Sequence, residues 1–101
     1  EKVKILRYEN GGKYKWHTDC GSRETSLRKL TAIVQLSDET KYEGGSLEFG
    51  ITDKSGKNNY TAPRTRGSIT IFPAFLSHRV TPITKGKRYS LITWMLGDCF
   101  V

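Results

Sequence analysis

Apolar and polar residues alternate with a period of two along most of this sequence, and turn-forming residues interrupt the alternation at short intervals. The alternating segments are KVKILRY, KLTAIVQLS, GSLEFGI, GSITIFPA, SHRVTPI and RYSLITWML, and no segment carries a convincing helical stripe over ten residues. This pattern is typical of strands with one buried face. Several short strands in one small domain favour a sandwich or a barrel, so we predict an all-β fold with few or no helices.

The size of the chain limits it to one domain. With 101 residues, of which 36% are hydrophobic, it can build one modest core, so we expect residues 1–101 to form a single domain. The sequence has no apolar run long enough to cross a bilayer and no signal-peptide layout at its start, which favours a cytoplasmic protein without a membrane partner. In that compartment we expect Cys20 and Cys99 to be free thiols.

The chain is basic, with a formal net charge of +7 and a pI near 9.6. This charge suits an anionic partner such as nucleic acid, an acidic protein or a small dicarboxylate. A basic surface that only keeps the protein soluble fits equally well. The one long polar segment, TDKSGKNNYTAPRTRG from Thr52 to Gly67, is interpreted as a loop, and loops of this kind often border binding sites.

Three residues could form a metal site. His17 and Asp19 stand two positions apart in the extended segment NGGKYKWHTDC, where both side chains would point to one face. The other histidine, His78, opens a later strand. Two histidines and one carboxylate leave about three coordination positions open, as in non-haem Fe(II) sites, whereas a structural zinc site usually closes its fourth position. A His-x-Asp pair on its own is more often a surface hydrogen bond.

A second cluster lies on the last strand. Arg88, Ser90, Ile92 and Trp94 share one face of RYSLITWML. If this face points inward, the guanidinium needs an anion, because an unpaired charge is too costly to bury. A carboxylate bound by Arg88 in bidentate fashion and hydrogen-bonded to Ser90 would satisfy it. The alternative is that Arg88 belongs to an exposed basic surface, KGKR.

Four motifs, in order along nearly the whole chain, resemble the prolyl 4-hydroxylase-like branch of the Fe(II)- and 2-oxoglutarate-dependent dioxygenases. YENGGKYKWHTD is similar to the family's Tyr-x-x-Gly-x-x-Tyr-x-x-His-x-Asp opening, and YEGGSLEF to its Gly-Gly-x-Leu-x-Phe strand. GSITIFPA is similar to its Gly-x-x-x-x-Phe-Pro strand, and HRVTPITKGKRYSLITW to its distal His, Val, Pro, Gly, Arg and Trp run. The resemblance implies a double-stranded β-helix, a cupin-like jelly-roll barrel of eight strands with iron at its open end.

The resemblance also implies roles for individual residues. His17, Asp19 and His78 would be the iron ligands, and Arg88, assisted by Ser90, would bind the distal carboxylate of 2-oxoglutarate. The remaining residues implied around the co-substrate are Tyr8, the wall residues Thr31, Ile33 and Gln35, and the apolar Leu47, Val80 and Trp94. The family often has a tyrosine where this sequence has Gln35. Leu47 and Val80 could equally be plain core residues.

The implied activity is hydroxylation of a C–H bond with dioxygen, coupled to conversion of 2-oxoglutarate to succinate and carbon dioxide, with ascorbate as a candidate reductant. The implied substrate is a prolyl or other residue of a peptide or protein. Two alternatives stay open: a hydroxylase of a free amino acid or small metabolite, and a metal-binding jelly-roll module without turnover. A nucleic-acid substrate is disfavoured, because PITKGKRYS lacks the second arginine and the asparagine of the nucleic-acid demethylating branch.

Members of this family usually carry helices ahead of the barrel that buttress its larger sheet, and this sequence begins at the first barrel strand. The chain is therefore interpreted either as the core of a longer protein or as a reduced form. In the reduced form, a partner or a second copy would cover the exposed sheet face, and we would expect weak homodimerisation.

Overall fold

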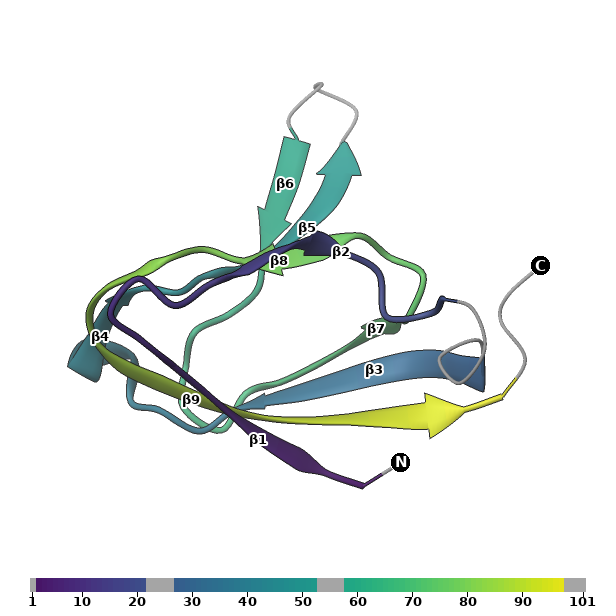
Figure 1. Ribbon diagram of the computed structural model, residues 1–101, viewed down its shortest axis with the longest axis horizontal. Helices are drawn as coiled ribbons and strands as arrows, with labels where there is room; N and C mark the ends of the chain where they lie inside the picture. Colours follow the sequence, from purple (N-terminus) through teal and green to yellow (C-terminus); the bar gives the residue numbers. More distant parts are fainter. Residues whose placement is uncertain (1, 22–26, 53–57, 98–101) are drawn as a thin grey trace.

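The computed structural model describes residues 2–21, 27–52 and 58–97, and in these residues the chain forms nine strands in two antiparallel sheets (Figure 1). The larger sheet has the order β1 (Lys4–Glu9), β9 (Ile83–Leu96), β3 (Arg28–Gln35) and β7 (Ile69–Pro73), and β4 (Tyr42–Gly44) pairs with the beginning of β9. The smaller sheet has the order β2 (Tyr14–His17), β8 (His78–Val80), β5 (Leu47–Thr52) and β6 (Asn58–Thr61). A short 3-10 turn, η2 (Glu39–Lys41), precedes β4.

The two sheets face each other, and the β5–β6 hairpin projects away from them (Figure 1). The core lies between the sheets, as expected when each strand buries alternate side chains. Its buried apolar residues are Tyr8, Ile33, Tyr42, Leu47, Phe49, Ala62, Phe72, Val80, Ile83, Ile92 and Trp94. The prediction of an all-β fold is confirmed.

The sequence located six of these strands, but two boundaries differ from the expectation. β6 lies inside the segment Thr52–Gly67 that we interpreted as a loop, so that interpretation is wrong for Asn58–Thr61. β9 starts at Ile83, upstream of the predicted segment, and runs through Gly86. Gly86 has a φ of 76°, and a β-carbon there would collide with the backbone carbonyl of Lys41. Only glycine tolerates both conditions, and this close approach lets β4 pair with β9.

The outward-facing residues of the larger sheet form an apolar surface, which we call the outer face. One row crosses four strands in register, because Ile5 pairs with Leu91, Leu91 with Val34, and Val34 with Ile69. Ile5 and Ile69 are 68% and 62% exposed, and Ile71 in the neighbouring row is 58% exposed. A surface of this kind is unusual for a monomeric domain.

Two smaller observations complete the fold. Cys20 is disulfide-bonded, so the expectation of a free thiol is wrong for this residue, while Cys99 lies outside the described residues. In the part of the chain that the structure describes, no helix has the length and apolar character needed to span a membrane.

Candidate active site

The three candidate metal ligands converge between the sheets. His17 ends β2, His78 begins β8, and the two residues face each other in the strand pairing. Asp19 follows β2 rather than lying within it, and its backbone N–H donates to the carbonyl of Ala74. The three donor atoms lie within 4.8 Å of one another, with Asp19 Oδ1 3.4 Å from His17 Nε2 and 3.5 Å from His78 Nε2. Metal–ligand bonds of about 2.1 Å would place adjacent ligands of a facial triad about 3 Å apart, close to these values.

Both imidazoles present the same nitrogen to this centre. The Nδ1 of His17 lies 2.6 Å from the carbonyl oxygen of Lys15, and the Nδ1 of His78 lies 2.9 Å from that of Leu76. Because a carbonyl only accepts hydrogen bonds, Nδ1 of each ring carries the proton and donates it. In the neutral form of each ring, Nε2 therefore directs its lone pair at the space beside Asp19. Hydrogen bonds of this kind orient the histidine ligands of metal sites.

The carboxylate of Asp19 is oriented in the same way. Thr31 Oγ1 donates to its Oδ2 at 2.7 Å, and the indole Nε1 of Trp94 donates to the same oxygen at 3.1 Å. The other oxygen, Oδ1, is left for the histidines or a metal. The structure thus places Thr31 and Trp94 against the carboxylate, a contact more specific than the roles in the co-substrate wall and in apolar packing that the resemblance implied.

The pKa values of the triad reflect these contacts. Burial acts to raise the pKa of Asp19, but hydrogen bonds from His17, Thr31 and Trp94 and the charge of His78 outweigh it and hold that pKa at about 2. Burial acts to lower the pKa of His17, but its hydrogen bonds to Asp19 and the Lys15 carbonyl raise it above 6.5. Burial dominates at His78 and lowers its pKa. Near neutral pH the site therefore holds a carboxylate and a neutral His78, which suits a divalent cation.

Arg88 is buried, and no described residue provides it with a counter-ion. Its side chain comes from β9 and is 3% exposed, its Nη1 lies 3.5 Å from Ser90 Oγ, and its guanidinium carbon lies 5.3 Å from the ring centroid of Tyr8. Its Nε has no hydrogen-bond partner, and no ion pair between described residues includes Arg88. Burial lowers the pKa of the guanidinium. Such a group requires an anion supplied by a ligand.

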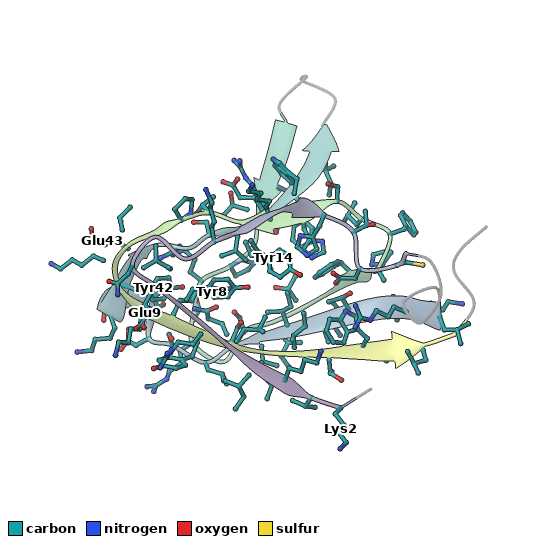
Figure 2. All side chains as sticks on the ribbon, viewed as in Figure 1. Lys2, Tyr8, Glu9, Tyr14, Tyr42 and Glu43 are labelled. Carbon is teal, nitrogen blue, oxygen red and sulfur yellow. The ribbon has the colours of Figure 1, made fainter. Side chains whose placement is uncertain are left out.

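One cavity of about 230 Å³ joins the triad to Arg88. Of the residues implied by the resemblance, it is lined by Tyr8, His17, Asp19, Ile33, Leu47, His78, Val80, Arg88, Ser90 and Trp94. Tyr8 and Tyr14 both line this cavity, and Figure 2 shows them between the two sheets. Thr31 and Gln35 do not line the cavity.

A network behind Arg88 was missed by the sequence analysis. Gln35 Nε2 donates to the hydroxyl of Tyr42 at 2.6 Å, and the Tyr42 side chain also forms a hydrogen bond with Arg88. Arg64 lies over the ring of Tyr42, 4.5 Å from its centroid, and donates to the carbonyl of Gly44 at 2.8 Å. Tyr42 is the first residue of the motif YEGGSLEF, so this motif could have indicated it.

The opening of the cavity carries three further residues that the sequence analysis did not assign. The ring of Tyr14 stacks on that of His17 with centroids 3.9 Å apart. Arg28 stacks on the indole of Trp94 at 3.7 Å, and Lys4 approaches the same indole at 5.4 Å. We call Lys4, Tyr14, Arg28 and Trp94 the mouth of the cavity. No pattern of alternation distinguishes these side chains from other strand residues.

Known structures with a similar fold include prolyl hydroxylases. A prolyl-4-hydroxylase from Pseudomonas putida superposes with a TM-score of 0.78 at 23% identity, covering 95% of this chain and 52% of that one. A prolyl hydroxylase from Trichoplax adhaerens, solved in complex with a peptide fragment of the hypoxia inducible factor oxygen degradation domain, superposes with a TM-score of 0.76 at 19% identity and covers 96% and 43%. The predicted jelly-roll fold is confirmed.

Sequence comparison gives the family. A PKHD-type hydroxylase from Synechococcus sp. (strain CC9605) is 33% identical over 91 residues, covering 90% of this chain and 40% of the relative, and one from Idiomarina loihiensis is 33% identical over 94 residues, covering 93% and 41%. The chain thus spans about two fifths of these relatives. The model of the 2OG-Fe(II) oxygenase superfamily matches residues 3–96. This protein chain belongs to the 2OG-Fe(II) oxygenase superfamily.

Proposed function

We propose that residues 1–101 form the catalytic domain of an Fe(II)- and 2-oxoglutarate-dependent oxygenase that hydroxylates a C–H bond in a peptide or protein, most simply at a prolyl residue. One observation carries the proposal. Two imidazole Nε2 atoms and a carboxylate oxygen converge at one end of a cavity that also contains the buried, unpaired guanidinium of Arg88. A cation site and an anion site in the same cavity suit a metal and a small dicarboxylate that spans the space between them.

The residues present fit both groups. His17, Asp19 and His78 would hold Fe(II) on one face, and Arg88 with Ser90 would bind the distal carboxylate of 2-oxoglutarate. When bound, iron and 2-oxoglutarate would allow dioxygen to act as the oxidant: one oxygen atom would enter the substrate as a hydroxyl group, and the other would enter succinate as 2-oxoglutarate is oxidised and releases carbon dioxide. Because the cofactor and co-substrate supply this chemistry, the chain needs no general base of its own.

The remaining cavity residues would position and shield the reactants. Leu47 and Val80 are buried in the cavity wall and would exclude water from it. Thr31 and Trp94 would hold the Asp19 carboxylate in place through its Oδ2. Tyr14, stacked on His17 at the mouth, would hold the substrate carbon beside the metal.

The peptide substrate is supported by the relatives. Similar curated sequences include PKHD-type hydroxylases, and similar solved structures include prolyl hydroxylases, one of them in complex with a peptide fragment. The mouth of the cavity, with four aromatic or cationic side chains around an opening, also suits an extended peptide better than a fully enclosed metabolite.

The first test is an anaerobic titration of the Fe(II)-loaded protein with 2-oxoglutarate. A 2-oxo acid that chelates iron through two oxygens is expected to give a weak visible charge-transfer band. We expect the band in the wild-type protein and its loss in His78→Ala, with the fold checked by circular dichroism. Iron binding without a band would refute the co-substrate site and leave a metal-binding module.

The second test is turnover with synthetic proline-containing peptides, in air and with ascorbate. We expect one oxygen atom added per peptide, detected by mass spectrometry, and one succinate formed per hydroxylation. Succinate formation without any modified peptide would refute the peptide substrate and favour a small metabolite.

A further inference from the structure

Tyr42 contacts Arg88 from outside the cavity that joins Arg88 to the metal triad. Tyr42 is 4% exposed, and its side chain forms a hydrogen bond with Arg88. Arg88 lines the cavity, whereas Tyr42 lines a second, smaller space that Arg88 also borders. The phenol can therefore act on a ligand in the cavity through the guanidinium, without touching the ligand.

Three strands hold the phenol and the guanidinium together. Tyr42, at the β4 end of the molecule (Figure 2), begins β4 and is paired with Gly86, two residues before Arg88 on β9. Gln35 ends β3 and is paired with Ser90, two residues after Arg88. Because backbone pairing fixes both neighbours to β9, their side chains reach the region of the guanidinium from a defined direction.

The segment that begins with Tyr42 also contacts the stem of Arg88. Gly45, three residues after Tyr42, has a φ of 62°, and a β-carbon there would lie 3.1 Å from Cδ of Arg88. The glycine backbone therefore packs against the aliphatic part of the arginine, while the phenol contacts its charged end. The long side chain is restricted at two points, although a free arginine has many rotamers.

The hydroxyl of Tyr42 holds Arg88 without neutralising it. Gln35 Nε2 donates to this oxygen at 2.6 Å, and a guanidinium has only donors, so the oxygen accepts from both. A neutral acceptor satisfies an N–H group but leaves the positive charge available to an anion, whereas an acidic residue would compete with the ligand. No ion pair between described residues includes Arg88. The network thus orients the guanidinium for a ligand carboxylate.

We propose that Tyr42 is a positioning residue: its hydroxyl, held by Gln35, fixes the guanidinium of Arg88 at one depth in the cavity and thereby sets the length of dicarboxylate that the site prefers. This inference rests on the proposed function and adds a residue that governs co-substrate selection without contacting the co-substrate. A ligand one methylene longer would place its distal carboxylate out of line with a fixed guanidinium. Without the hydroxyl, the arginine can move to follow that carboxylate.

The test measures binding without turnover. The protein is loaded with Mn(II) under nitrogen and titrated in a calorimeter with three 2-oxo acids. These are 2-oxoglutarate, 2-oxoadipate, which is one methylene longer, and 2-oxopentanoate, which has the carbon chain of 2-oxoglutarate but no distal carboxylate. The wild-type protein should bind 2-oxoglutarate most tightly. The titration with 2-oxopentanoate measures the metal end of the site alone, because this acid offers no anion to Arg88.

Tyr42→Phe removes only the hydroxyl. The Kd of 2-oxoglutarate should rise about tenfold and that of 2-oxoadipate at most about twofold, so the preference for 2-oxoglutarate should shrink about fivefold. The Kd of 2-oxopentanoate should not change. Tyr60→Phe is the matched control, because it removes the same atom from an exposed tyrosine of β6 and should change none of the three affinities.

Gln35→Met tests the inference by a second route, which also serves if circular dichroism shows that Tyr42→Phe does not fold. It removes the donor that holds the phenol, so the affinities should change in the same direction by a smaller factor. Because Gln35 acts through Tyr42, the double variant should bind 2-oxoglutarate no more weakly than Tyr42→Phe alone. Additive losses would mean that Gln35 acts independently, and would overturn the proposed arrangement.

Three further results would overturn the inference. Tyr42→Phe could weaken all three acids equally, which would indicate general damage to the site. It could leave the affinity for 2-oxoglutarate unchanged or raise it, which would show that the hydroxyl only satisfies a buried N–H group. The wild-type protein could bind the two dicarboxylates equally well. In each case 2-oxoglutarate still binds more tightly than 2-oxopentanoate to the wild-type protein, and the proposed function stands. Failure of 2-oxoglutarate to bind the wild-type protein would instead refute the proposed function itself.

Discussion

Replacing Arg88 by methionine should make the ligand-free protein more stable and the co-substrate much weaker. Arg88 is 3% exposed, its Nε has no hydrogen-bond partner, and no ion pair between described residues neutralises it. An unsatisfied buried polar group costs about 1–3 kcal/mol, and methionine fills a similar space without a charge. We therefore expect the free energy of unfolding to rise by about 1–2 kcal/mol, which corresponds to an increase in Tm of about 5–10 °C for a domain of this size.

The same substitution removes the proposed partner of the distal carboxylate of 2-oxoglutarate. Leaving one member of a buried ion pair without the other costs about 3–5 kcal/mol. The dissociation constant of 2-oxoglutarate should therefore rise by roughly two to four orders of magnitude. Metal binding should be unchanged, because Arg88 does not contact the triad.

Thermal unfolding of the metal-free protein and titration of the metal-loaded protein with 2-oxoglutarate measure the two effects separately. Arg79→Met is the matched control, because Arg79 is partly exposed and paired with Glu48 at the surface. It should cost at most about 1 kcal/mol of stability and leave the co-substrate affinity unchanged. A ligand-free Arg88→Met that is less stable than the wild type would refute the reasoning, since it would mean that the guanidinium is already satisfied within the fold.

Three further predictions concern the metal ligands and the outer face. Thr31→Val removes a donor to Asp19 Oδ2 at nearly constant volume, so the affinity for Mn(II) should fall about tenfold in a calorimetric titration; an unchanged affinity would show that the hydroxyl does not orient the carboxylate. Metal binding should weaken as the pH falls through the pKa of His17, which is raised above 6.5. In a plot of the logarithm of metal affinity against pH, the initial slope should correspond to one proton released per metal bound, because the pKa of His78 is lowered and that of Asp19 is about 2. A slope of two would contradict these directions. If the outer face binds a second copy, sedimentation should detect a weak dimer that Ile71→Glu dissociates, and a monomer at millimolar concentration would exclude it.

The parts of the fold that could be predicted from the sequence are those governed by alternation. The period of two on RYSLITWML placed Arg88, Ser90 and Trp94 on one face, and all three are buried. β4 and β6 were missed because YEG and NNYT each contain a single apolar residue and so show no alternation, and β4 pairs only because Gly86 allows close approach.

The candidate site was predictable in its residue types but less so in its contacts. Spacing put His17 and Asp19 together, although Asp19 reaches the site from a bend after β2 and not from the strand itself. The family resemblance implied that Thr31 belongs to the co-substrate wall, but it did not indicate that the Thr31 hydroxyl meets Asp19, because that contact joins two elements whose relative position comes from the whole barrel. Tyr42 was missed for the same reason.

The continuous strand β9 has a consequence for which dicarboxylates the cavity can accept. Trp94 donates a hydrogen bond to Asp19, the proposed metal ligand, and Arg88, six residues earlier on the same strand, is the residue proposed to bind the far end of the co-substrate. The spacing of residues along β9 therefore sets the distance between the two charged groups. Side chains on one face of the strand repeat about every 6.6–6.8 Å, whereas one additional methylene group lengthens a ligand by only about 1.3 Å. A register shift thus cannot adapt the cavity to a slightly longer or shorter dicarboxylate, and a change of preferred chain length must come from the reach of the side chain at position 88.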